Sequence, residues 1–305
     1  MSAFETKGLA EKTLDEATLQ QWVGHSEHRT DIMHPGPVER MDALLDQPIL
    51  EQPGSAIPKR TLPPLYHWLY FLPNALQSDL GDDGHPKLGG FLPPVDLPRR
   101  MWAGGRLTFK GSLQIGEAAD RVSTVTAVKR KEGRSGPLCF VTVRHVITGQ
   151  KSAGTLTEEH DIVYRGAVQP DGTRKTKQDS LEIAGADHDG RKQASDAIET
   201  IRPSAVMLFR YSALTFNGHR IHYDREYCRD VEGYPGLVFH GPLTATLLAR
   251  LASRLNPDRT MASFAFTARA PLLDTAPFTL HTPSPGRFEA RTPAGTLAME
   301  AVATF

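Results

Sequence analysis

Between Met101 and Val168 the chain carries four strand-forming segments in succession, separated only by short glycine-containing turns. They read GRLTFKGSL, DRVSTVTAVKRK, PLCFVTVRHVI and EEHDIVYRGAV, and they are rich in Val, Ile, Thr and aromatic residues. Neighbouring parallel strands need a crossover of a dozen or more residues, usually a helix, and no such crossover fits between these segments. The sequence therefore predicts an antiparallel meander and argues against a doubly wound parallel sheet.

A helix with one apolar face opens a second block of strands. In LTATLLARLASRLNP the leucines recur at helical spacing on one face, and Pro257 follows the end of the segment. Further strand-forming segments follow: the alternating run from Phe264 to Ala270, then FTLHT, GRFEART and GTLAMEAVATF. We also expect residues 205–216, AVMLFRYSALTF, to form a strand that leads into this block. The apolar helix face must be buried, and a curved sheet wrapped round the helix is the simplest cover.

The N-terminal region supplies a matching helix and a long arm. Residues 13–22 are expected to be helical because Thr13 and Glu16 form a capping box, and residues 38–46 carry apolar side chains at helical spacing. The segment HRTDIM between them is short and extended. Residues 51–100 are rich in proline, which excludes a central strand or a long helix. We interpret them as an extended arm packed over a domain surface.

A polar segment divides the chain into two parts. Residues 169–196 contain few large apolar residues, as expected of a linker or a long surface loop. We therefore expect an N-terminal domain at 1–168 that includes the arm, the linker, and a C-terminal domain at 197–305. The predicted fold class is α+β, with two antiparallel sheets each wrapped round a central helix. Pairing the two sheets edge to edge would remove exposed strand edges.

The composition of the chain limits which kinds of binding partner and which cellular compartment are expected. Lys+Arg and Asp+Glu number 35 each among 305 residues, so neither a nucleic-acid partner nor an anionic membrane is expected. No signal-peptide core and no window of roughly 18 apolar residues is present. Cys139 and Cys228 form no CxxC pair and have no metal-binding cluster around them, so we expect reduced thiols, a cytoplasmic protein and no metal.

Two short segments of the C-terminal part carry residues suited to chemistry: NGHRIH, residues 217–222, and FHGPLTATLL, residues 239–248. Pro242 stands where a helix begins, so the Gly241 amide is among the free donors of a helix N-terminus and suits a developing oxyanion. His222 can exchange protons near neutral pH, and Asn217 can orient a water molecule. Each also has a structural interpretation that the residues leave open: a strand-to-helix turn, a buried histidine and a turn residue.

The segment NGHRIH resembles the hydratase signature Asp-x-Asn-Pro-aliphatic-His of the MaoC-like dehydratase family. In that signature the aspartate and the histidine act together on water, and they fall on Asn217 and His222. The middle asparagine falls on His219 and the proline on Arg220. The family's glycine, whose amide binds the thioester oxygen, falls on Gly241, preceded here by His240.

The resemblance extends over most of the chain. HWLYFLP, GGFLPPVDLPRRMWAGGRLTF and EEHDIVYR, with FNGHRIHYDREYCRDVEGYPGLVFHGPL further on, are similar to the group of mesaconyl-C4-CoA and itaconyl-CoA hydratases. That group implies a double hot-dog fold and the reversible hydration of an enoyl-CoA to a 3-hydroxyacyl-CoA. It also implies that neither a metal nor a redox cofactor takes part, since CoA belongs to the substrate. An amide cannot act as a general base, so Asn217 would hold the water while His222 takes its proton.

The group also implies a short, branched dicarboxylic acyl chain, whose free carboxylate needs a cationic partner. Arg220 is the first candidate and Arg210 the second, while His219 and His240 are candidate substrate contacts; Arg220 can instead hold Asp224. Basic candidates for the CoA phosphates are Arg99, Arg100 and Arg106, which can equally hold the arm or remain solvated.

Two other functions stay open on the sequence. One is a 3-hydroxyacyl-thioester dehydratase of fatty-acid metabolism, and the other is a non-catalytic acyl-CoA-binding protein on the same fold. The N-terminal part lacks the catalytic pattern, since position 29, five residues before His34, is Arg. We expect that part to be a scaffold that widens the acyl pocket. A homodimer is possible.

Overall fold

The computed structural model describes residues 16–46, 61–133, 136–166 and 197–305. The predicted linker at 169–196 and the capping box at Thr13 lie outside these residues, so only the last part of the first predicted helix is described, as α1 (Glu16–Gln20). Among the described residues, no helix is both long enough and apolar enough to cross a membrane.

The described strands form one antiparallel sheet of ten, in the order β1-β3-β4-β5-β2-β7-β10-β9-β8-β6. The first part of the chain contributes β1 (Ser26–Ile32), β2 (Arg99–Lys110), β3 (Ala118–Gly133), β4 (Gly136–Gly149) and β5 (Thr155–Arg165). The second contributes β6 (Glu199–Ile201), β7 (Ser263–Ala268), β8 (Phe278–Ser284), β9 (Arg287–Arg291) and β10 (Leu297–Thr304). The predicted antiparallel pairing is confirmed, but the meander holds only for β3, β4 and β5, because β2 pairs with β5 and not with β3. The two blocks join edge to edge through β2 and β7.

Glycine makes the seam between the two blocks possible. Gly104 pairs with Thr267, and Gly105 pairs with Phe266. A Cβ atom on Gly104 would lie 2.5 Å from the Phe266 carbonyl oxygen, and one on Gly105 would lie 2.9 Å from the Phe266 ring. No larger residue fits this approach without displacing backbone, so the double glycine lets the two blocks share one sheet.

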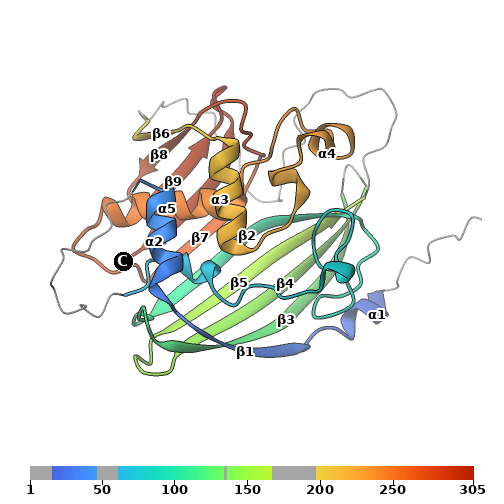
Figure 1. Ribbon diagram of the computed structural model, residues 1–305, viewed down its shortest axis with the longest axis horizontal. Coiled ribbons are helices and arrows are strands. Elements are labelled where there is room, and N and C mark those ends of the chain that lie inside the picture. The colour runs from blue at the N-terminus through green and yellow to red at the C-terminus, as the bar shows by residue number, and fades with distance from the viewer. Residues whose placement is uncertain (1–15, 47–60, 134–135, 167–196) are drawn as a thin grey trace, which may run out of the picture.

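The leucine-rich segment forms α5 (Gly241–Arg254), which packs against β7, β9 and β10 as predicted (Figure 1). Its leucines Leu243, Leu247, Leu248 and Leu251 are buried. In the first block, α2 (Pro35–Leu44) begins three residues earlier than expected because Pro35 is favoured in the first turn of a helix. Figure 1 shows α2 beside α3 (Ala205–Thr215), and both belong to the main apolar core.

The prediction that residues 205–216 form a strand is wrong, because they form α3. The Ser204 side chain accepts a hydrogen bond from the Met207 amide and caps the helix. Ala, Met and Leu favour a helix, and Val206 is the only β-branched residue in its first turns. The helix ends where Phe216 takes a left-handed conformation with φ 48°. The polar segment that follows is therefore delivered by the end of a helix, not by a strand.

The proline-rich arm behaves as expected over its described part, residues 61–98. It contains only two short 3₁₀ turns, η1 (Tyr66–Leu69) and η2 (Gln77–Asp79). Farther along, Val95 and Leu97 pack in a second apolar cluster with Val125, Val141 and Tyr164 of the long strands. The arm thus packs along the first block, with residues 65–71 in the main core beside α2 and residues 95–97 in the second cluster.

Candidate active site

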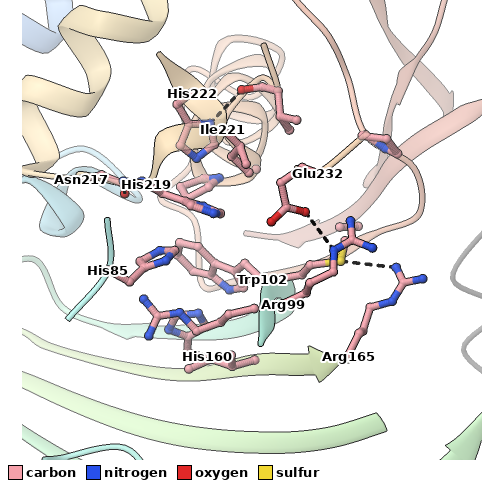
Figure 2. Close-up of a pocket in the computed structure, with 18 of the residues that line it drawn as sticks. His85, Arg99, Trp102, His160, Arg165, Asn217, His219, Ile221, His222 and Glu232 are labelled. Atoms are coloured by element: carbon pink, nitrogen blue, oxygen red, sulfur yellow. Dashed lines mark hydrogen bonds and ion pairs between the residues drawn. The ribbon is translucent and has the colours of Figure 1, made fainter. Parts of the chain in front are cut away.

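A cavity of about 730 Å³ lies where the two blocks meet. Its walls come from the arm, from β2, β4 and β5, from the segment after α3, and from the start of α5. The side chains of His222, His219 and His85 follow one another along one wall, with ring centroids 5.4 Å and 4.1 Å apart (Figure 2). Both blocks are therefore needed to build the cavity.

The segment from Asn217 to His222 is shaped by its own hydrogen bonds. The Asn217 side-chain oxygen accepts from the His219 amide at 3.0 Å, which makes a tight turn directly after α3. The 3₁₀ turn η3 (Arg220–His222) then directs His222 into the cavity wall. Asn217 and His222, the candidate catalytic residues, line the cavity together with His219, a candidate substrate contact.

His222 is arranged as a neutral base. Its Nδ1 lies 2.7 Å from the Val238 carbonyl oxygen, which can only accept a hydrogen bond, so Nδ1 carries the proton. Burial lowers the pKa of His222 to about 4, although the hydrogen bond to Val238 works in the opposite direction. At neutral pH the imidazole is uncharged, and Nε2 has a free lone pair that can accept a proton from water.

Gly241 lies opposite this base as the first residue of α5 and lines the cavity. Its amide is one of the free donors at the helix N-terminus, where the helix dipole favours negative charge. A Cβ atom at this position would meet nothing within 4 Å, so the side of Gly241 without a side chain is open. The arrangement suits a thioester oxygen that gains negative charge.

His240 is fully buried and is not among the residues that line the cavity. Its ring stacks on His222 with centroids 3.7 Å apart, and its Nε2 lies 2.9 Å from the Ser212 hydroxyl. The structure therefore places this candidate substrate contact behind the base, where it supports the His222 ring instead of reaching a ligand.

The two arginines expected to hold a substrate carboxylate both lie outside the cavity. The Arg220 guanidinium pairs with Asp224 one helical turn later, at 2.7 Å, and stacks on Tyr227. Arg210 is exposed on α3. The structure thus corrects the expectation that these arginines hold a substrate carboxylate. For Arg220 the reason is local, because Asp224, four residues later, holds its side chain at the surface.

Several cavity residues come from the first block, and among them Arg99 and Arg100 were candidates on the sequence only for the CoA phosphates. Arg100 lines the cavity, and its charge lowers the pKa values of His85 and His160, in addition to the larger effect of burial. No described carboxylate lies within ion-pair distance of Arg100. Arg99, by contrast, pairs with Glu232 at 2.8 Å (Figure 2). Arg106 pairs with Glu159 and Asp161 away from the cavity.

The floor of the cavity is aromatic and neutral. Trp102 stacks on His160 with centroids 4.0 Å apart, and its indole nitrogen donates to the Gly104 carbonyl. Burial lowers the pKa values of His145 and His160 to about 4. Arg100 thus faces neutral imidazoles on this side and has no described carboxylate within ion-pair distance, which favours an anionic ligand group.

The arm adds a carboxylate–imidazole pair next to His219. His85 Nδ1 lies 2.8 Å from Asp83 Oδ2, and the ligand atoms of Asp83, His85 and His219 all lie within 4.8 Å of one another. These donor types can hold a divalent cation. In the structure the Asp83 carboxylate is already bound by the His85 ring and by the His85 amide, so the geometry is that of a hydrogen-bonded pair.

Known proteins share this sequence and this architecture. Residues 65–274 match the family of hydroxyacyl-thioester dehydratases type 2. The chain is 44% identical to the mesaconyl-C(4)-CoA hydratase of Chloroflexus aurantiacus over 294 residues, which cover 94% of this chain and 98% of that protein.

Solved structures share the fold at low sequence identity. A MaoC-like dehydratase from Phytophthora capsici superposes with a TM-score of 0.61 at 13% identity, covering 95% of this chain and 99% of the other. A Mycobacterium tuberculosis protein described as having a double hot-dog fold superposes with a TM-score of 0.53 at 14% identity, covering 92% and 96%. The predicted double hot-dog fold is confirmed. On the match to residues 65–274 and the 44% identity, the chain belongs to the hydroxyacyl-thioester dehydratase type 2 family of MaoC-like dehydratases.

Proposed function

We propose that this protein is a hydro-lyase that adds water to an enoyl-CoA and, in reverse, dehydrates a 3-hydroxyacyl-CoA. The observation that carries the proposal is the placement of a free His222 Nε2 and a free Gly241 amide in one cavity. A 44% identical relative named as a hydratase supports it.

The proposed reaction moves one water molecule across the double bond. His222 Nε2 takes a proton from water, and the hydroxide oxygen bonds to the β-carbon. The π electrons move onto the thioester oxygen, which the Gly241 amide stabilises. The proton then passes to the α-carbon, which restores the thioester and the neutral base. This sequence uses neither a metal nor a redox cofactor, and CoA enters as part of the substrate.

We further propose a short, branched dicarboxylic acyl group, and Arg100 as its carboxylate partner. The relative is named for mesaconyl-C(4)-CoA, in which the free carboxylate is bonded to the β-carbon that receives the hydroxide. The carboxylate must therefore lie close to the base. Arg100 is the candidate because it lines the same cavity, its charge acts on His219, the neighbour of His222, and no described carboxylate pairs with it.

The test is an absorbance assay of enoyl-thioester loss with mesaconyl-C4-CoA and crotonyl-CoA, with itaconyl-CoA followed by chromatography of its product because its double bond is not conjugated with the thioester. We expect the C5 dicarboxylic substrates to react faster than crotonyl-CoA. In Arg100→Gln the kcat/KM for the dicarboxylic substrates should fall roughly 10²- to 10³-fold, because a charge-assisted bidentate contact is lost. Crotonyl-CoA should lose far less, and equal losses on both would remove Arg100 as the clamp.

A straight-chain 3-hydroxyacyl thioester is the second candidate. The name of the family and the apolar cavity residues Phe91, Leu138, Val143 and Ile162 favour it. Faster turnover of crotonyl-CoA and longer enoyl-CoAs than of the C5 substrates would select this candidate. Acyl-CoA binding without turnover by the wild type would instead select the binding protein.

We keep a cytoplasmic location and a homodimer as predictions about the partners of the chain. Fractionation of cells tests the first, and sedimentation equilibrium of the purified protein tests the second.

A further inference from the structure

The amide at position 217 leaves the site without the carboxylate base of the signature. The Asn217 oxygen accepts a hydrogen bond from the His219 amide and has a second lone pair that can accept one from water, but an amide cannot take up a proton. A carboxylate-backed base would have to come from another part of the cavity wall.

A turn of the arm, residues 81–85, is pressed onto the segment 217–220. The Arg220 amide donates to the Asp83 carbonyl at 2.9 Å, and the Arg220 guanidinium donates to the Asp82 carbonyl at 3.0 Å. Gly84 has φ +86°, and a Cβ atom there would lie 2.0 Å from the Gly218 carbonyl oxygen. Backbone therefore meets backbone, which holds the turn in a defined position beside the proposed catalytic segment.

This docking places an oriented imidazole in the cavity. Both Asp83 oxygens accept from His85, one from Nδ1 at 2.8 Å and one from the amide at 2.9 Å. With its proton on Nδ1, the neutral His85 ring has its lone pair on Nε2. His85 lines the cavity and lies against His219, with ring centroids 4.1 Å apart.

The burial of His85 and the charges around it suit a base that takes up a proton and releases it again during the reaction. Burial lowers the pKa of His85 and Arg100 lowers it further, while the Asp83 carboxylate raises it. Burial works to raise the pKa of Asp83, but the hydrogen bond and the charge of His85 outweigh it, and the pKa lies well below its usual range. Asp83 is thus a permanent anion that stabilises the imidazolium once His85 accepts a proton.

We propose that His85, oriented by Asp83, is a second acid–base residue of this active site and supplies the carboxylate-backed base that position 217 lacks. The inference rests on the proposed hydration reaction and refines its proton transfers. In this refinement His85 Nε2, in place of His222, takes the transferred proton from water, while His222 Nε2 accepts a hydrogen bond from the hydrogen that stays on the hydroxide. As hydroxide bonds to the β-carbon, the His85 imidazolium forms, and it then returns the same proton to the α-carbon. The net change is the addition of one water molecule.

The experiment compares Asp83→Asn with Asp82→Asn in the full-length protein. Asp82 lies in the same turn with an exposed side chain, so its variant controls for altered charge near the cavity. We expect kcat in Asp83→Asn to fall about 10²- to 10⁴-fold, as for loss of an acid–base group, and to stay within a few-fold in Asp82→Asn. The melting temperature and the affinity for butyryl-CoA, by calorimetry, should be retained in both variants.

A pH profile separates catalysis from loop structure. The charged and titratable groups that face His85 are Asp83, Arg100 and His219, with His222 beyond them. Because Asp83 raises the pKa of His85, its removal should move the acidic limb of kcat/KM to lower pH. A defect in the turn alone would lower the whole profile without moving the limb, and that result would overturn the proposal.

His85→Gln provides the second variant if Asp83→Asn does not fold. It should lose kcat to a similar extent, and near-wild-type activity would overturn the proposal. So would loss of wild-type activity in EDTA with recovery on adding a divalent cation, because the cluster would then be a metal site. A wild type that hydrates no acyl-CoA of the panel would remove the proposed function itself, whereas an active wild type with a fully active Asp83→Asn removes only this inference.

Discussion

Two histidine–carboxylate pairs occupy very different positions in this molecule. In the sheet of the first block, His67 Nε2 lies 3.0 Å from Glu158, and Trp68 donates to the other oxygen of the same carboxylate at 3.1 Å. Both side chains of that pair are only 3% exposed. At the junction of the blocks, the His85 and Asp83 side chains are 20% and 25% exposed, and His85 lines the cavity.

The difference shows that surroundings, not chemical identity, separate a structural pair from a functional one. His67 uses Nε2, the outer nitrogen of its ring, to reach Glu158, so that atom is taken. His85 uses Nδ1 to reach Asp83 and keeps Nε2 toward the cavity. We therefore expect changes to the first pair to cost stability and changes around the second to cost activity.

The largest expected effect lies on the cavity side, at His222. In His222→Ala the kcat should fall roughly 10³- to 10⁴-fold, because the imidazole that binds and polarises the attacking water is removed. Affinity for butyryl-CoA should be retained, since Gly241 and the apolar walls are untouched. Steady-state hydration assays and calorimetry measure the two quantities. Loss of affinity with unchanged kcat would assign His222 to binding instead.

The sheet pair should give the opposite result. Glu158→Leu leaves the buried His67 and Trp68 nitrogens without their acceptor, and the free energy of unfolding should fall by about 3–5 kcal/mol. Urea denaturation measures this change. The kcat of the remaining folded protein should stay within a few-fold of the wild type. A large drop in kcat without loss of stability would show that this pair also acts in the reaction.

The buried histidines predict a fall in stability with acid. Burial lowers the pKa values of His145, His160 and His222 from 6.5 to about 4. Between these values the unfolded chain binds more protons than the folded one, so stability decreases as the pH falls through this window. Glu158 extends the loss: burial works to raise its pKa, but His67 outweighs this and holds it at about 2, below its ordinary 4.5. Thermal melting from pH 7 to 4 tests this, and a flat melting temperature would contradict it.

The smallest effect is expected at Arg220, which joins the two blocks at the surface. Its side chain is 37% exposed, and loss of an exposed ion pair costs about 1 kcal/mol or less. Arg220→Ala should therefore change kcat/KM only slightly, and equally for dicarboxylic and monocarboxylic substrates. A selective loss for the dicarboxylic substrates would restore Arg220 as the clamp and displace Arg100.

Much of the fold could be predicted because its signals are local. The strand-forming segments from Met101 onward, the leucine face of α5 and the proline-rich arm all keep the character expected of them. The exception is α3. Its apolar run is too short to show a clear helical period, so the sequence alone predicts a strand there. Its capping Ser204 was the available signal that a helix begins there.

The residues of the candidate site also divide into those that could be predicted from the sequence and those that could not. His222, Asn217 and Gly241 lie within 25 residues of one another and belong to one motif, so their approach to one cavity could be foreseen. Asp83, His85 and Arg100 are more than 110 residues from that motif in the sequence. Their approach depends on the edge pairing of β2 with β7 and on the docking of the arm at Gly84 and Gly218.

Periodicity and capping thus establish which faces are buried and which elements form, because these depend on residues a few positions apart. The pairing of the second base with the first, and the choice of Arg100 over Arg220 inside the cavity, depend on contacts between distant segments. Those contacts are decided by packing and steric fit, which only the folded chain brings together, whereas the competition of Asp224 for Arg220 is local and could be stated as an alternative from the sequence.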